Sequence, residues 1–292
     1  TLTLLAGLAT VGAAQTEAED EDPVAIFNAG QELHEKGDFA GAIKQYEMAI
    51  SIVPDFPEAE YQRGSAQLSL GKTDDAERGF RKALELRPEW TLAMTSLGSL
   101  LVERAPAEAA PLLEKVVKLE PQNSLALAAL TELRLNAKAA PAVLHDLLAK
   151  ITALTTGKVK PTAALWAARA ALESELGLKA QARTSLASAL NIDTKSRTAL
   201  MQAAEVALAD GDLLRATELT DRLKGVTGET DQIKYLGAAI LAYEGNTDEA
   251  LKLLEAIKTP NRAAIDLQTR LKAATASTAD LEKMLETNPK DA

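Results

Sequence analysis

The sequence predicts an all-α fold in which short helix pairs repeat along the chain and stack into a solenoid. Glycines recur at an interval of 34 residues, which links Gly37 to Gly71 and Gly177 to Gly211 and then to Gly245. Apolar residues follow one another at spacings of three and four on both sides of these glycines, which is the pattern of amphipathic helices rather than strands. Proline follows the second segment of three units, at Pro54, Pro88 and Pro121.

Composition narrows the possible functions. The 292 residues are 47% hydrophobic and 25% charged, with 32 basic and 42 acidic side chains and a formal net charge of -10. An acidic chain with only 3% aromatic residues and no dense basic cluster is not expected to bind nucleic acid, which needs positive charge and stacking surfaces. The absence of cysteine excludes disulfides, thiolate metal sites and cysteine nucleophiles.

The amino-terminal residues 1–14 are uncharged and mostly apolar or small, and an acidic linker at 15–22 follows them. This order is typical of a secretory signal segment, with small residues Gly12 and Ala14 placed for cleavage before Gln15. We therefore expect a periplasmic or secreted protein, with a signal anchor as the alternative. No later apolar run reaches the length of a membrane span, so we expect none in the mature chain.

The first unit shows why each helix begins and ends where it does. A helix is expected around Ile26 and Leu33, and Gly37 after it can adopt the left-handed conformation that ends a helix. Asp38 is placed to cap the second helix, and Pro54 ends that helix by removing a backbone donor. Gly30 allows the two helices to cross closely.

The same interval relates further positions: Gly30 to Gly64, Ala42 to Ala76, Tyr46 to Phe80 and Ala49 to Ala83. This pattern resembles the tetratricopeptide repeat, which has small residues at positions 8, 20 and 27, a large apolar residue at 24 and proline at 32. The resemblance implies a right-handed superhelical solenoid of antiparallel helix pairs. It also implies that Tyr46 and Phe80 fill the space between neighbouring units.

About eight units can be placed, six clear and two degenerate. The clear units are 23–56, 57–90, 91–123, 163–196, 197–230 and 231–260, and the degenerate ones are 124–152 and 261–288. The extra residues near 153–162 predict a linker between an N-terminal array at 23–152 and a C-terminal array at 163–292. The last degenerate pair would cap the C-terminal array.

Sequence motifs for catalysis are weak. Gly157 and Lys158 lack the other residues of a phosphate-binding loop, and neither His34 nor His145 has a second ligand at metal-binding spacing. Paired carboxylates such as Asp74 and Asp75 recur at helix starts, where they favour the positive end of the helix dipole. We therefore expect no enzyme activity, cofactor or metal.

The resemblance implies a binding groove lined by positions 2, 5, 9, 12 and 13 of each unit. The candidate peptide-binding residues are Phe27, Gln31, Tyr61, Leu68, Thr95, Met201 and Tyr235. Aromatic anchors of this kind dominate many interfaces, although each side chain could instead pack against a neighbouring helix. The residues that clamp a chaperone carboxylate in some members of this family are absent.

We therefore expect a non-catalytic scaffold or adaptor that binds a protein or peptide ligand. Two alternatives stay open at this stage. The chain could be a self-associating structural protein of the cell envelope, or it could be an accessory subunit of an enzyme complex whose catalytic chain is encoded elsewhere.

Overall fold

The computed structural model describes residues 22–157 and 160–275, and in these ranges it contains only helices as regular structure. The helices form two compact units, one ending at Leu100 and the other beginning at Leu101. Each unit is described separately. In the described ranges no helix combines the length and the apolar character that crossing a membrane requires.

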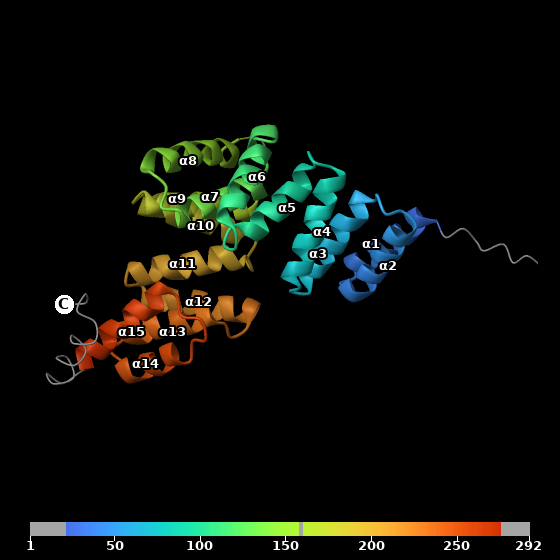
Figure 1. The fold of residues 1–292 in the computed structure, drawn as a ribbon. Coiled ribbons are helices and arrows are strands. Elements are labelled where there is room, and N and C mark those ends of the chain that lie inside the picture. Colours follow the sequence, from blue (N-terminus) through green and yellow to red (C-terminus); the bar gives the residue numbers. More distant parts are fainter. Residues whose placement is uncertain (1–21, 158–159, 276–292) are drawn as a thin grey trace, which may run out of the picture. The chain divides into compact units, whose positions relative to one another are not determined.

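The first unit contains two complete helix pairs and most of a fifth helix (Figure 1). Its helices are α1 (Pro23–Glu35), α2 (Phe39–Ile52), α3 (Pro57–Ser69), α4 (Thr73–Leu86) and α5 (Thr91–Leu101, which ends at the first residue of the second unit). In this unit α1 packs on α2, α2 on α3 and α3 on α4, so each second helix contacts both its own partner and the next first helix.

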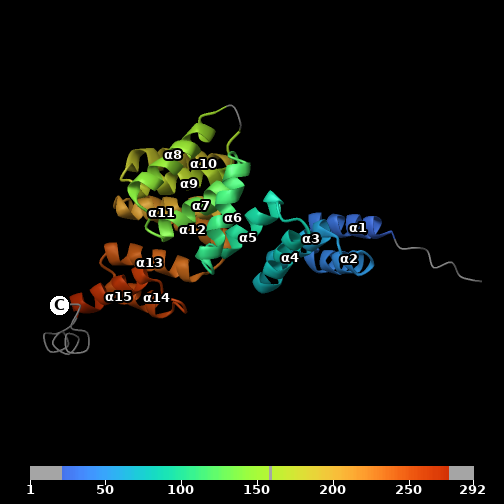
Figure 2. The ribbon, with the colours of Figure 1, turned by 45° about the horizontal axis from the view of Figure 1, so that its top comes forward.

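The second unit is built of the same helix pairs (Figure 2). Its helices are α6 (Pro106–Leu119), α7 (Ser124–Asn136), α8 (Pro141–Thr155), α9 (Ala163–Glu175), α10 (Lys179–Ile192), α11 (Arg197–Ala209), α12 (Leu213–Thr227), α13 (Asp231–Tyr243), α14 (Thr247–Glu255) and α15 (Arg262–Thr275). The first helices α7, α9, α11, α13 and α15 pack one on the next in a continuous row. The predicted all-α fold of repeated helix pairs is confirmed.

The turn signals behave as the sequence predicts. Gly37 has a φ of 80°, and the four other period-marking glycines also lie between 73° and 84°. Asp38 and Asp212 accept hydrogen bonds from the backbone N–H of Gly41 and Arg215, at 2.9 and 3.1 Å, and so cap α2 and α12. The fourth pair has no glycine in its turn, and Lys138 adopts the left-handed conformation there with a φ of 49°.

The close crossing of the helices in the first unit is also confirmed. A Cβ atom on Gly30 would lie 2.6 Å from Cε1 of Tyr46, so only glycine fits between α1 and the tyrosine ring. Tyr46 and Phe80 lie against the glycine of their own helix pair. Tyr46 also belongs to a buried cluster with Ala66 of the next pair, as expected for a ring between neighbouring units.

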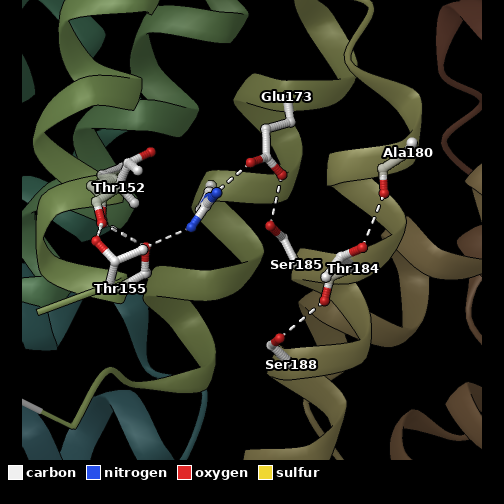
Figure 3. A network of polar contacts seen from close by, with 10 residues as sticks. Thr152, Thr155, Glu173, Ala180, Thr184, Ser185 and Ser188 are labelled. Atoms are coloured by element: carbon white, nitrogen blue, oxygen red, sulfur yellow. Dashed lines mark hydrogen bonds and ion pairs between the residues drawn. The ribbon is translucent and has the colours of Figure 1, made fainter.

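The division between the units differs from the predicted joint at 153–162. That segment lies inside the second unit, because α9 packs against both α7 and α8 across it. Figure 3 shows polar contacts among α8, α9 and α10: Arg169 donates to the Thr155 hydroxyl at 2.9 Å and to Glu173 at 2.7 Å. Glu173, only 2% exposed, accepts a hydrogen bond from Ser185 on α10 at 2.6 Å.

Several predictions lie outside the described residues. They are the signal segment at 1–14, all but the last residue of the acidic linker at 15–22, and the second helix of the capping pair beyond residue 275. The first helix of that pair is present as α15, which packs on α13 and α14.

Candidate binding pocket in the second unit

A hollow of about 590 Å³ opens between α11, α13 and α15. We call it the C-terminal pocket. Its lining residues are Glu205, Leu208, Ala209, Tyr235, Ala239, Ala242, Tyr243, Asn261, Ala263, Leu267 and Arg270. The volume is within the range of sites that hold small molecules or the side chains of a bound peptide.

The repeat geometry explains how α11 and α13 form this pocket. Helix α13 begins 34 residues after α11, so equivalent positions of the two helices face the same way. Positions 9, 12 and 13 of α11 and positions 5, 9, 12 and 13 of α13 supply seven of the lining residues. The hollow exists because Ala209, Ala239 and Ala242 are short, while Tyr235 and Leu208 form taller walls.

Helix α15 forms the remaining wall, and Asp231 at the start of α13 helps to hold the loop that leads into it. The Asp231 carboxylate accepts hydrogen bonds from the backbone N–H groups of Lys258 and Thr259, at 3.1 and 3.0 Å, and from Lys234. The backbone bond from Thr259, followed by the bond from Lys234, holds the pKa of Asp231 well below its ordinary value. Asn261 then caps α15 through the N–H of Ala264 at 2.9 Å.

Within residues 22–157 and 160–275, the charged groups of the C-terminal pocket have no ionic partner. Glu205 accepts a hydrogen bond from Gln232 at 3.2 Å, and no cation of the described residues lies within ion-pair distance of it. Surrounding protein raises the pKa of Glu205, although the Gln232 bond partly opposes this. On the other wall, Arg270 makes only a long hydrogen bond, 3.4 Å, to the backbone oxygen of Asp266.

Tyr235 lies between these charges. Burial raises the pKa of its hydroxyl, and Glu205 raises it further, whereas Arg270 lowers it. The tyrosine ring packs on the clusters that join α11, α13 and α15. The pocket therefore offers apolar and aromatic lining residues together with one charge of each sign that has no ionic partner in the described part of the chain.

Two other hollows in the second unit already contain charge pairs. A hollow of about 520 Å³ between α6, α7 and α8 is lined by the ion-paired Arg134 and Glu114. A third, of about 450 Å³ between α10, α11 and α12, is lined by Arg183 and Asp210, which pair at 2.6 Å. Because these charges are satisfied internally, the C-terminal pocket is the better candidate for a site.

Of the residues predicted in the second unit, Tyr235 lines the pocket, while Met201 packs partly buried against the core and is not among the lining residues. Sequence reasoning did not single out Glu205, Tyr243, Asn261 or Arg270. Glu205 is at position 9 of its unit, and a charged residue at a groove position is a sequence signal that could have identified it. The α15 residues could not, because that degenerate unit has no clear repeat register.

In the first unit, the predicted aromatic residues contact other aromatic side chains. The Phe27 ring centroid lies 5.6 Å from that of Tyr46 and 5.0 Å from that of Phe56. The Tyr61 ring lies 5.5 Å from Phe80 and 5.0 Å from Trp90.

The remaining predicted groove residues of the first unit differ in how far they are exposed. The Tyr61 hydroxyl is 3.2 Å from that of Ser96, and Thr95, 3% exposed, donates to the backbone oxygen of Thr91 at 2.7 Å. Leu68 is 41% exposed and Gln31 is partly exposed.

Comparison with protein families supports the repeat assignment. A family model described as TPR repeat matches residues 30–71, and one described as Tetratricopeptide repeat matches residues 61–124. These matches lie in the first unit and the beginning of the second. They contain neither α11, α13 nor α15.

Two curated proteins share similar segments. The chain is 30% identical over 96 residues to "TPR repeat-containing thioredoxin TTL4" of Arabidopsis thaliana, a match that covers 33% of this chain and 14% of the relative. It is 31% identical over 96 residues to "DnaJ homolog subfamily C member 3" of Rattus norvegicus, with 32% and 19% covered. The chain thus spans less than a fifth of each relative.

Solved structures show the same fold over most of the chain. A tetratricopeptide repeat protein from Parabacteroides merdae has a TM-score of 0.62 at 15% identity, with 85% of this chain and 98% of that chain covered. The Cut9–Hcn1 hetero-tetramer of APC/C gives 0.61 at 18% identity, with 76% and 44% covered. Residues 30–124 are thus the part matched by the repeat models, and the described helices after them continue the same helix-pair fold.

Proposed function

We propose that this protein is a binding scaffold that holds a segment of a partner polypeptide in the C-terminal pocket. The observation that carries the proposal is that groove positions of two successive repeats, in α11 and α13, line one hollow with an apolar floor and unpaired charges. Stacked helix pairs of this type commonly present such surfaces to extended or helical peptides. The proposed role is non-catalytic.

The aromatic residues of the first unit have a different role in this proposal. Phe27 and Tyr61 contact aromatic residues of their own unit, so they stabilise it before any ligand is present. Tyr235 instead lines an open hollow. Binding energy should therefore depend most strongly on the C-terminal pocket.

A pocket-filling variant tests this proposal. Ala239→Phe adds a ring to the floor of the pocket, whereas Ala180→Phe adds the same group to an exposed position on α10 as a matched control. We would capture partners from the native source with the full chain and compare the three baits by mass spectrometry. A partner held by the original chain and by Ala180→Phe, but lost from a still-helical Ala239→Phe, supports the proposal. Equal capture by all three contradicts it.

Association between copies is the second candidate function. Leu214 on α12 is 85% exposed and Leu125 on α7 is 59% exposed, and both lie in the second unit. Sedimentation over a range of concentrations tests this candidate directly. A mass that rises with concentration and falls in Leu214→Ser would favour self-association.

Export to the periplasm or to the exterior is also proposed, on the apolar stretch within residues 1–14 and the acidic stretch that follows. Cell fractionation and amino-terminal sequencing of the native protein test it. A native amino terminus at Gln15 in an extracytoplasmic fraction supports export, and retention of the apolar stretch in the cytoplasm contradicts it.

A further inference from the structure

The groove positions of the second unit carry negative charge and no positive charge. At positions 2, 5, 9, 12 and 13 of α7, α9, α11 and α13, the ionisable acidic residues are Glu132, Glu175 and Glu205, and none of these positions holds lysine or arginine. All three carboxylates belong to exposed residues. At these positions of the four helices, a ligand therefore meets negative charge and no positive charge.

Two of these carboxylates lack a cation at ion-pair distance among the described residues. Glu205 has only the neutral Gln232. Glu132 lies near Arg197, which lowers its pKa, but burial and the neighbouring Glu103 raise it more. The neighbouring protein therefore disfavours the charged form of both carboxyl groups, and an incoming ammonium or guanidinium group would offset that penalty.

The spacing of the two carboxylates limits what can pair with both. Glu132 is influenced by Arg197, at the start of α11, and Glu205 lies eight residues further along that helix. Helix α9 lies between α7 and α11, so two helix separations of 8–10 Å apply. Together with eight residues at a rise of 1.5 Å each, they place the carboxylates on the order of 20–23 Å apart. An extended chain covers this distance in about six to seven residues.

Arg270 is the counter-charge at the opposite end. It lines the C-terminal pocket from α15, which packs on the other side of the row from α11, next to α13. On its remaining side α11 packs on α9, and α9 packs on α7, where the groove positions are acidic or neutral. The apolar lining residues of the pocket accept an uncharged side chain.

We infer that the partner segment is a basic peptide that places an apolar side chain in the C-terminal pocket, one lysine or arginine at Glu205 and a second one at Glu132. The inference rests on the proposed function and adds the chemistry of the ligand. The two basic residues are separated by about six to seven residues in an extended chain. Charge complementarity of this kind selects the partner and speeds its association.

A peptide selection tests the ligand class without knowledge of the native partner. Random twelve-residue peptides displayed on phage would be selected on the full chain, and in parallel on Ala239→Phe and Ala180→Phe. We expect peptides retained by the full chain and by Ala180→Phe, but not by Ala239→Phe, to carry two basic residues at the stated spacing beside an apolar residue. Pocket-dependent peptides that are neutral or acidic would overturn the inference and leave the proposed function intact. A selection without any pocket-dependent peptide would count against both.

Charge variants then test the pairing, with a selected peptide labelled for fluorescence anisotropy. We expect Glu205→Gln to weaken binding about tenfold and Glu132→Gln about threefold. Glu218→Gln, which removes the same charge from the exposed face of α12, should leave affinity unchanged. Arg270→Gln should bind at least as tightly as the original chain, because among the described residues it removes the only cation that lines the pocket.

The same measurement includes outcomes that contradict the inference. Affinity should fall as salt rises from about 0.05 to 0.3 M, since exposed charges are screened over that range. Salt-independent binding would exclude pairing with Glu132 and Glu205. A loss in Arg270→Gln without a loss in Glu205→Gln would reverse the assigned charge of the ligand.

Discussion

The two units use the same helix pair but close the space between its helices differently. In the first unit, Gly30 and Gly64 at position 8 lie against the large rings of Tyr46 and Phe80 at position 24. In the second unit, the position-8 residues Ala170, Ala204 and Ala238 are matched with Leu186, Thr220 and Leu254. Glycine with an aromatic ring, and alanine with a smaller side chain, are thus two solutions to one packing problem.

This difference decides what an aromatic residue at position 5 does. Tyr61 finds Phe80 and Trp90 beside it and is held within its own unit. Tyr235 packs on clusters of buried aliphatic side chains and lines an open pocket. The same residue type at the same repeat position is therefore structural in one unit and available to a ligand in the other.

The largest effect should come from removing a ring of the first unit. Phe80→Ala should lower the free energy of unfolding of that unit by about 4 kcal/mol, because a buried ring leaves a cavity beside Gly64. Trp90 reports on the first unit and Trp166 on the second, so fluorescence in a Trp166→Phe background isolates the first. Leu214→Ala, at an 85% exposed site, is the control and should change stability by less than about 0.5 kcal/mol.

The second unit should be most sensitive at its buried polar network. Glu173→Ala removes the acceptor for Arg169 and Ser185 and should cost about 3 kcal/mol, because it leaves a partly buried guanidinium without its partner. Trp166 fluorescence during urea unfolding measures the change. The exposed pair of Arg183 and Asp210 provides the contrast: Asp210→Ala should cost at most about 1 kcal/mol. Equal costs would show that the network does not stabilise the α8–α9–α10 packing.

The two tyrosines at position 5 test the comparison most directly. Tyr61→Ala should destabilise the first unit by about 2–3 kcal/mol, since its ring contacts two aromatic neighbours. Tyr235→Ala should cost about 1–2 kcal/mol and abolish pocket-dependent binding, while Tyr61→Ala should leave binding to the second unit intact. Unfolding curves and anisotropy on the same two variants measure both effects. A reversed pattern would refute the division of roles.

A smaller effect is expected at the turn of the fourth pair. Lys138 has a φ of 49° where other turns use glycine, so Lys138→Gly should raise the stability of the second unit by about 0.5–1 kcal/mol. Gly211→Ala should lower it by a similar amount, because its φ is 74°. A loss of stability in Lys138→Gly would show that the lysine makes a contribution beyond backbone conformation.

The smallest effect on global stability should come from Asp231, whose contacts are local to α13 and the loop before α15. Because its folded-state pKa is depressed, its contribution is fully present above the unfolded pKa of about 3.9 and is lost as pH falls through the lower folded value. Hydrogen exchange in α15 should therefore be faster in Asp231→Asn than in the original chain at pH 7. The two proteins should converge in strong acid. An exchange rate in α15 that is unchanged at pH 7 would show that Asp231 does not hold this wall of the pocket.

The sequence by itself determined the helix pairs, because a 34-residue period, glycines with left-handed conformation and capping aspartates act locally. Only the tertiary structure decided which groove residues are free. Tyr61 is not free, because Phe80 and Trp90 lie against its ring. Tyr235 is available to a ligand, because it lines a pocket together with Ala239 and residues of α15. Likewise, the boundary within α5 replaces the expected joint at 153–162, because packing of α9 on α7 and α8 is a contact that local sequence signals do not encode.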